Sequence, residues 1–115
     1  MAAAFDWLNT TLLISDSASA IYTNAASTTT FITNILLHNT DSSAIDVTLY
    51  FVPDSSGSVG TAAAGNQFFK QTLAANETFP INDVTQIFGD TNDTLQAVAG
   101  TASKVTIFVN GAKQT

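Results

Sequence analysis

The chain contains no cysteine and no arginine, and only three lysines among its 115 residues. The absence of cysteine excludes disulfide bonds, thiolate zinc sites and a cysteine nucleophile. Three lysines against nine acidic residues give a net charge of −6, and without a basic cluster we expect no binding to nucleic acid. Charged residues make up 10% of the chain, well below the ~25% of an average soluble domain. A surface rich in Thr, Ser, Asn and Ala is easily desolvated, which suits large assemblies.

Long apolar runs are also missing. Hydrophobic residues account for 45% of the chain, but no run approaches the roughly 20 apolar residues of a membrane-spanning helix, so we expect no contact with a membrane. The first eight residues lack a basic flank and include Asp6, which is unlike a signal peptide, so classical secretion is not expected. The length is typical of one domain, and we predict a single domain over residues 1–115 with an N-terminal segment at 1–10.

The residues that are present indicate an all-β fold. Residues Ile45 to Val52 alternate between apolar and polar side chains, as do Lys104 to Asn110, with Gly111 ending the second strand. Thr30 to His38 carries apolar residues of both parities, which is typical of a central strand with both faces covered. Further strands are predicted at Thr11–Ile14, Ser19–Thr23, Gln67–Leu73, Thr78–Ile81, Thr85–Phe88 and Thr94–Ala99.

Turn residues organise these strands. Asn39 to Ser43 can bond its own backbone, so Thr30 to Val52 is predicted to form a hairpin. Residues 53–66 are low in complexity and long for a connection, which predicts a flexible loop. One short helical turn at Asp83 to Phe88 is an alternative to a strand there. Together these features predict a single antiparallel β-sandwich or barrel of about eight strands.

Few residues offer chemistry. The single histidine, His38, has no second histidine or cysteine for a metal site, and it is interpreted as a surface or hydrogen-bonded residue. The stretch Gly57 to Gly60 approaches a serine-hydrolase motif with the wrong spacing. The acidic cluster Gly89 to Asp93 has ligands for calcium but lacks the rest of a calcium loop, and a hairpin turn is the simpler interpretation. Sequons at Asn9, Asn76 and Asn92 are interpreted as turn and strand-edge residues. We therefore predict neither catalysis nor a cofactor or metal.

Aromatic residues are the more informative feature. Phe5 and Trp7 precede the first long strands, and Tyr50 and Phe108 have the outward parity of their strands. Outward aromatic side chains occur on ordinary surfaces, but they are also enriched at the centres of protein interfaces. Phe5, Trp7, Tyr50 and Phe108 are the candidate interface residues.

Four stretches carry a resemblance to a known group of proteins. They are FITNILLHNTDSSAIDVTLYFVP at 31–53, LAANET at 73–78, DTLQAVAGTAS at 93–103 and VTIFV at 105–109. With these turn-and-strand patterns the chain resembles short structural proteins of tailed bacteriophages, from residue 31 onward. The resemblance implies a jelly-roll-like sandwich and a virion component assembled in the host cytoplasm.

The function implied is that of a capsid cement or decoration protein, a homotrimer that binds the major capsid protein or other virion proteins. Two alternatives remain open at this point. One is a tail, baseplate or fibre-attachment subunit. The other is a carbohydrate-binding sandwich in which Trp7, Tyr50 or Phe108 stacks on a sugar.

Overall fold

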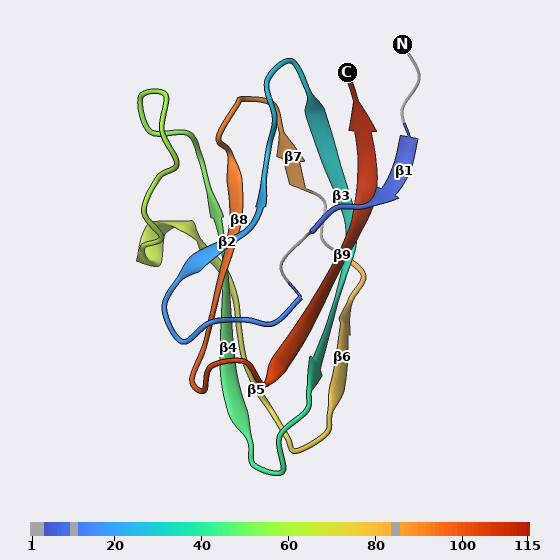
Figure 1. The fold of residues 1–115 in the computed structure, drawn as a ribbon, viewed down its shortest axis with the longest axis vertical. Helices are drawn as coiled ribbons and strands as arrows, with labels where there is room; N and C mark the ends of the chain where they lie inside the picture. The colour runs from blue at the N-terminus through green and yellow to red at the C-terminus, as the bar shows by residue number, and fades with distance from the viewer. Residues whose placement is uncertain (1–3, 10–11, 84–85) are drawn as a thin grey trace.

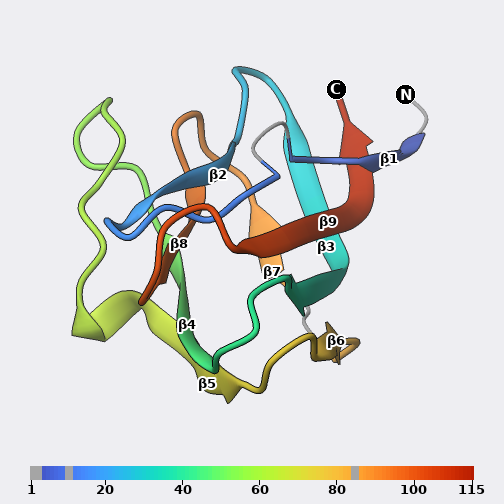
Figure 2. The same ribbon diagram turned by 60° about the horizontal axis from the view of Figure 1, so that its bottom comes forward.

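The computed structural model describes residues 4–9, 12–83 and 86–115, with side chains from Trp7 onward. Its strands form two antiparallel sheets that pack face to face as a β-sandwich (Figures 1 and 2). The only helical segment in these ranges is the short 3-10 turn η1, Ala64–Asn66. The all-β class predicted from the sequence is confirmed.

The first sheet has the order β1-β9-β3-β6, and β7 pairs with β3 on the same edge as β6. Its strands are β1 (Ala4–Trp7), β9 (Val105–Gln114), β3 (Thr29–Asn39), β6 (Thr78–Ile81) and β7 (Gln86–Phe88). The second sheet has the order β2-β8-β4-β5, with β2 (Ser19–Thr23), β8 (Thr94–Ala99), β4 (Ile45–Val52) and β5 (Gln67–Leu73). With β6 and β7 sharing one position, this strand order is that of a jelly roll, as predicted.

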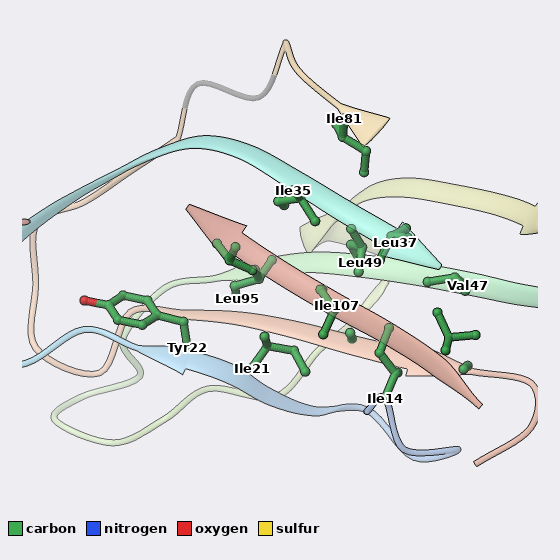
Figure 3. Packing of buried hydrophobic residues seen from close by; sticks show 14 of the residues in the cluster. Ile14, Ile21, Tyr22, Ile35, Leu37, Val47, Leu49, Ile81, Leu95 and Ile107 are labelled. Carbon is green, nitrogen blue, oxygen red and sulfur yellow. The ribbon is translucent and has the colours of Figure 1, made fainter. Parts of the chain in front are cut away.

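The core lies between the sheets and is built from the inward residues of both. Ile35 and Leu37 of β3, Leu49 of β4, Leu95 of β8 and Ile107 of β9 are fully buried and converge in Figure 3. Each such side chain contributes roughly 1.5–3 kcal/mol when removed from water. The alternation read from the sequence of β4 and β9 therefore identified the buried face of both strands correctly.

β3 is a central strand as predicted, but the predicted hairpin and the predicted cover on both of its faces are wrong. Thr30 to Val52 is not a hairpin, because β3 and β4 lie in opposite sheets and the turn after Asn39 crosses between them. The parity of β3 also changes along its length, because a bulge between Ile32 and Asn34 inserts one extra residue opposite β9. Ile32, Ile35 and Leu37 consequently point inward, whereas Phe31 and Leu36 point outward.

The prediction that Gly111 ends the last strand is wrong for a related reason. β9 continues to Gln114, and Gly111 lies opposite Ile32 at the bulge of β3. A side chain at position 111 would overlap the carbonyl oxygen of Phe31, so only glycine lets the two strands stay paired there. The glycine extends the ladder instead of breaking it.

The N-terminal part of the chain runs along the free edge of β9. β1 was not predicted as a strand, and it pairs with β9 from Ala4–Lys113 to Trp7–Asn110. Leu13 forms a single bridge to Thr106 in place of the strand predicted at Thr11–Ile14, whose first residue lies outside the described residues. Thr85 of the predicted strand Thr85–Phe88 also lies outside them, and residues 86–88 form β7 and no helical turn.

Aromatic side chains close the opposite side of the sandwich, where β5 and β6 are the sheet edges. A bulge between Leu49 and Tyr50 lets consecutive residues of β5 both pack inward. Phe68 stacks on Phe51 with ring centroids 3.9 Å apart, and Phe69 packs edge-on against Phe79 at 5.5 Å. The exposed faces of the two sheets are therefore the surfaces left for contacts with other molecules.

The segment predicted as a flexible loop joins β4 to β5 and projects from the second sheet (Figure 1). It contains a tight turn in which Ser55 and Ser58 bond each other, with Gly57 in the left-handed region. Gln96 of β8 donates a hydrogen bond of 2.9 Å to the carbonyl of Gly60. The flexibility of this loop stays a prediction.

Candidate interaction surface

The outer face of the first sheet is rich in large apolar side chains, and no other element of the described chain covers it. It is defined by Trp7, Leu13, Phe31, Leu36, Pro80, Ile87 and Phe108. Trp7 and Ile87 are 50% and 56% exposed, and Leu13 is also exposed. We refer to this surface as the apolar face.

The register of the strands lines these residues up. Leu36 on β3 lies opposite Phe108 on β9 and opposite Pro80 on β6, so the three form one row across the sheet. Phe31 lies opposite Ile87 in a second row nearer the other end of β3. Cross-strand neighbours on one face of a sheet are close enough to form a continuous surface.

Trp7 adds an aromatic ring to the row at Phe108. The two ring centroids are 5.9 Å apart with the planes tilted by 37°. Together with Leu36 and Asn110, these rings line an open groove of about 440 Å³. The groove has no charged side chain, and its floor is the outer surface of β3 and β9.

Asn9 holds the Trp7 segment in place. Its side chain is almost fully buried and bonds the backbone of β9 twice, donating to the carbonyl of Ile107 and accepting from the N–H of Val109, both at 2.8 Å. Its side-chain oxygen also accepts the indole N–H of Trp7 at 2.8 Å. The side-chain amide of Asn9 thus makes the two hydrogen bonds to β9 that the backbone of a neighbouring strand residue would make.

Acidic residues are rare on the strands of both sheets, with Asp6 on the edge strand β1 of the first sheet and Asp46 on β4 of the second. Strands β3, β6, β7 and β9 contain no Asp or Glu, although the whole chain has nine acidic residues. The outer face of the second sheet, by contrast, presents Asp46, Thr48, Lys70 and Thr72 around β4 and β5, and Thr72 donates to Asp46 at 2.5 Å. The outer surface of β3, β6, β7 and β9 is thus apolar and without carboxylates, and the outer face of the second sheet is largely polar.

The predicted interface residues are only partly brought together. Trp7 and Phe108 lie side by side on the apolar face, whereas Tyr50 lies in β4 of the second sheet. Phe5 is paired with Ala112 through the backbone, and its side chain lies outside the described residues. Sequence reasoning missed Leu36, Phe31 and Ile87, because both faces of β3 were expected to be covered and the three residues of β7 are too few to show alternation.

The remaining candidate residues have structural roles. His38 is half-buried, and its Nδ1 is 2.8 Å from the hydroxyl of Thr78 on the neighbouring strand. In the predicted turn Gly89 to Asp93, the carboxylate of Asp93 accepts the backbone N–H groups of Asp54 and Asp90 at 2.8 and 3.0 Å. The sequon residues Asn76 and Asn92 occupy left-handed turn positions, as interpreted.

Two features of the described residues bear on other functions. In residues 4–9, 12–83 and 86–115, no three His, Cys, Asp or Glu side chains are grouped as a metal ion would require. Within the same ranges, no helix has the length and hydrophobicity needed to cross a membrane. The predictions of no enzymatic activity and no cofactor stay predictions.

Comparisons with known proteins identify a similar fold. No family model and no curated protein matches the chain. One solved structure, from work describing Bacillus endospore appendages as a novel family of disulfide-linked pili, covers 98% of this chain and 88% of its own, with a TM-score of 0.52 and 14% identity. At this level of identity the similarity concerns the fold alone.

The function predicted from the sequence is corrected by this comparison. The structural neighbour belongs to a bacterial pilus, and it is neither a phage capsid or tail protein nor a carbohydrate-binding module. The cement-protein function and both of its alternatives are therefore wrong. The resemblance to phage structural proteins itself stays a prediction, because no matched family or curated relative bears on it.

Proposed function

We propose that the chain is a structural subunit that assembles with copies of itself into a pilus-like fibre. The observation that carries this proposal is the apolar face, which spans β3 and β9 and ends on Trp7 and Ile87 at its two sides. Uncovered apolar patches of this kind are typical of protein interaction sites. The similarity of the fold to a pilus subunit supports a fibre over other kinds of assembly.

Association in this fibre is non-covalent. The neighbour comes from a pilus that is linked by disulfides, but this chain has no cysteine and cannot form such links. Many modest contacts repeated along a lattice can replace a covalent bond, because avidity multiplies their individual affinities. The scarcity of charged residues favours such contacts, since little solvation free energy is lost when the surface is buried.

The proposal includes the absence of catalytic activity and of nucleic-acid or membrane partners. His38, the only histidine, bonds Thr78 on the sheet surface. The partner is a second copy of the chain, so the predicted homo-oligomer is retained. The predicted trimer and the predicted capsid partner depended on the virion function, so they are not part of this proposal.

Assembly of the purified chain tests the proposal. We expect sedimentation and negative-stain electron microscopy to show oligomers and fibres that grow with protein concentration. A strong thiol reductant should leave their number and length unchanged, because no disulfide contributes. A chain that stays monomeric at millimolar concentration under all conditions would contradict the proposal.

A further inference from the structure

We propose that the apolar face packs against the same face of a second copy, so that a two-fold pair is the unit from which the fibre is built. This inference rests on the proposed function and names the partner surface. It assigns the interface to the row formed by Leu36, Phe108 and Trp7.

The two outer faces of the sandwich differ in polarity as partners for the apolar face. The outer face of the second sheet presents Asp46 and Lys70, and stacking an apolar face on it would remove these groups from water without partners. Another copy of the apolar face costs less, because its polar side chains bond each other in the pairs His38–Thr78 and Asn34–Asn110. The surface that best complements the apolar face is therefore the same face of a second copy.

The net negative charge of the chain affects how two copies can approach each other. Each copy has a net charge of −6, so two copies repel each other on approach. The strands β3, β6, β7 and β9 contain no carboxylate, and the acidic residues of the described chain lie on β1, on the second sheet and in the connections. Contact through β3, β6, β7 and β9 therefore brings no carboxylate of these strands into the interface, and the one acidic residue of the first sheet, Asp6, lies on the edge strand β1.

The dimensions of the first sheet set the area that the apolar face can bury. The β3–β9 ladder runs from Thr29–Gln114 to Asn39–Val105, and the sheet is four strand positions wide. At ~3.3 Å per residue and ~4.8 Å per strand, this face covers roughly 600 Å². Two such faces bury roughly 1,200 Å², which is the lower limit for a specific interface, so the contact is large enough for a weak and concentration-dependent pair.

Symmetry then limits what the pair can do. A contact between identical surfaces is isologous and closes at two copies, so a fibre needs at least one further contact. The apolar face therefore forms the pair, and growth of the fibre uses other parts of the molecule. A variant that loses the pair keeps these other contacts but lacks the paired unit from which the fibre is built.

Single cysteines test this pairing cleanly, because the chain has none of its own. Asn110→Cys places a thiol beside the groove on the apolar face, and Lys70→Cys places one on the outer face of the second sheet as a matched control. Both variants are treated with a short bis-maleimide and analysed by denaturing gel and mass spectrometry. Asn34→Cys, which neighbours Asn110 on β3, replaces the first variant if that one fails to fold.

We expect Asn110→Cys to form at least tenfold more crosslinked dimer than Lys70→Cys. If Asn110→Cys crosslinks only when it is mixed with Lys70→Cys, the contact joins different faces, and the pairing is overturned while the proposed fibre stands. If the wild-type chain assembles but Asn110→Cys crosslinks neither alone nor when it is mixed with Lys70→Cys, the pairing is likewise overturned. If the wild-type chain does not associate at all, both the pairing and the proposed function fail.

Discussion

The indole nitrogen of Trp7 donates a hydrogen bond of 2.8 Å to the side-chain oxygen of Asn9, while the indole ring packs beside Phe108. Asn9 is itself fixed to β9 through Ile107 and Val109. The half-exposed indole is thus held in one orientation on the apolar face. A side chain that is ordered before association loses less conformational entropy on binding, which favours its use as an anchor.

Replacing Trp7 by alanine should weaken association and leave the fold intact. Tryptophan anchors contribute about 2 kcal/mol or more at interface centres, so we expect the dissociation constant of the pair to rise roughly 30-fold. The ring is half exposed, so the free energy of unfolding should fall by less than about 1.5 kcal/mol. Sedimentation equilibrium and urea unfolding measure the two effects. Loss of the fold in Trp7→Ala would contradict an interface role.

Asn39 should be far more important for stability than an exposed asparagine. Its buried side chain donates to the carbonyls of Ser43, Leu73 and Ala74, which ties the β3–β4 connection to the turn after β5. Asn39→Ala leaves these carbonyls without their donor, and we expect a loss of about 2–4 kcal/mol in urea unfolding. The control Asn34→Ala removes one exposed bond, to Asn110, and should cost less than about 1 kcal/mol. Equal losses would rule out this role for Asn39.

Gly111 is predicted to be irreplaceable for a steric reason. A methyl group there overlaps the backbone of Phe31 in the middle of the first sheet, so Gly111→Ala should lower the free energy of unfolding by about 2–3 kcal/mol. Gly89 has open space around the same position and an ordinary backbone conformation. Thermal unfolding of Gly89→Ala should therefore stay within about 0.5 kcal/mol of wild type. A stable Gly111→Ala variant would show that β3 and β9 are less closely paired there.

The sequence predicted the strands well because alternation survives wherever one face is buried and the other exposed. The bounds of β2, β4, β5, β6 and β8 agree with the predicted ranges residue for residue. The short strand β1 was missed because four residues at a sheet edge carry little periodicity, and its pairing with β9 depends on contacts nearly a hundred residues away.

The candidate surface was predicted only in part, and a bulge explains part of the difference. Phe108 was read correctly as outward because β9 alternates regularly up to Asn110. Phe31 has the spacing of the buried Ile35 and Leu37, but the extra residue at the bulge of β3 turns it outward, and no local signal in a run of Thr and Asn marks where a bulge falls. Leu36 was missed because both faces of β3 were expected to be covered. The prediction that β3 and β4 pair in one sheet failed because the residues Asn39 to Ser43 suit a hairpin turn and a connection between the two sheets equally well.

Association should strengthen with moderate salt. Two copies that each carry a net charge of −6 repel each other, and raising ionic strength from 0.01 to 0.15 M shortens the screening length from ~30 to ~8 Å. We therefore expect the dissociation constant of the pair to fall over this range. Light scattering across a salt titration measures the change. A contact held by ion pairs would weaken instead, and that result would contradict an apolar interface.

The most direct test of the account compares one substitution on each face of the sandwich. Leu36 and Val98 are both half-buried aliphatic residues that point outward from inner strands, Leu36 on the first sheet and Val98 on the second. We would measure sedimentation of Leu36→Ser and Val98→Ser across micromolar concentrations. Pairing through the apolar face predicts that Leu36→Ser forms the pair only at much higher concentration than wild type, while Val98→Ser forms it like wild type. Undiminished association of Leu36→Ser, or its loss in Val98→Ser alone, would contradict the claim that the apolar face joins the copies.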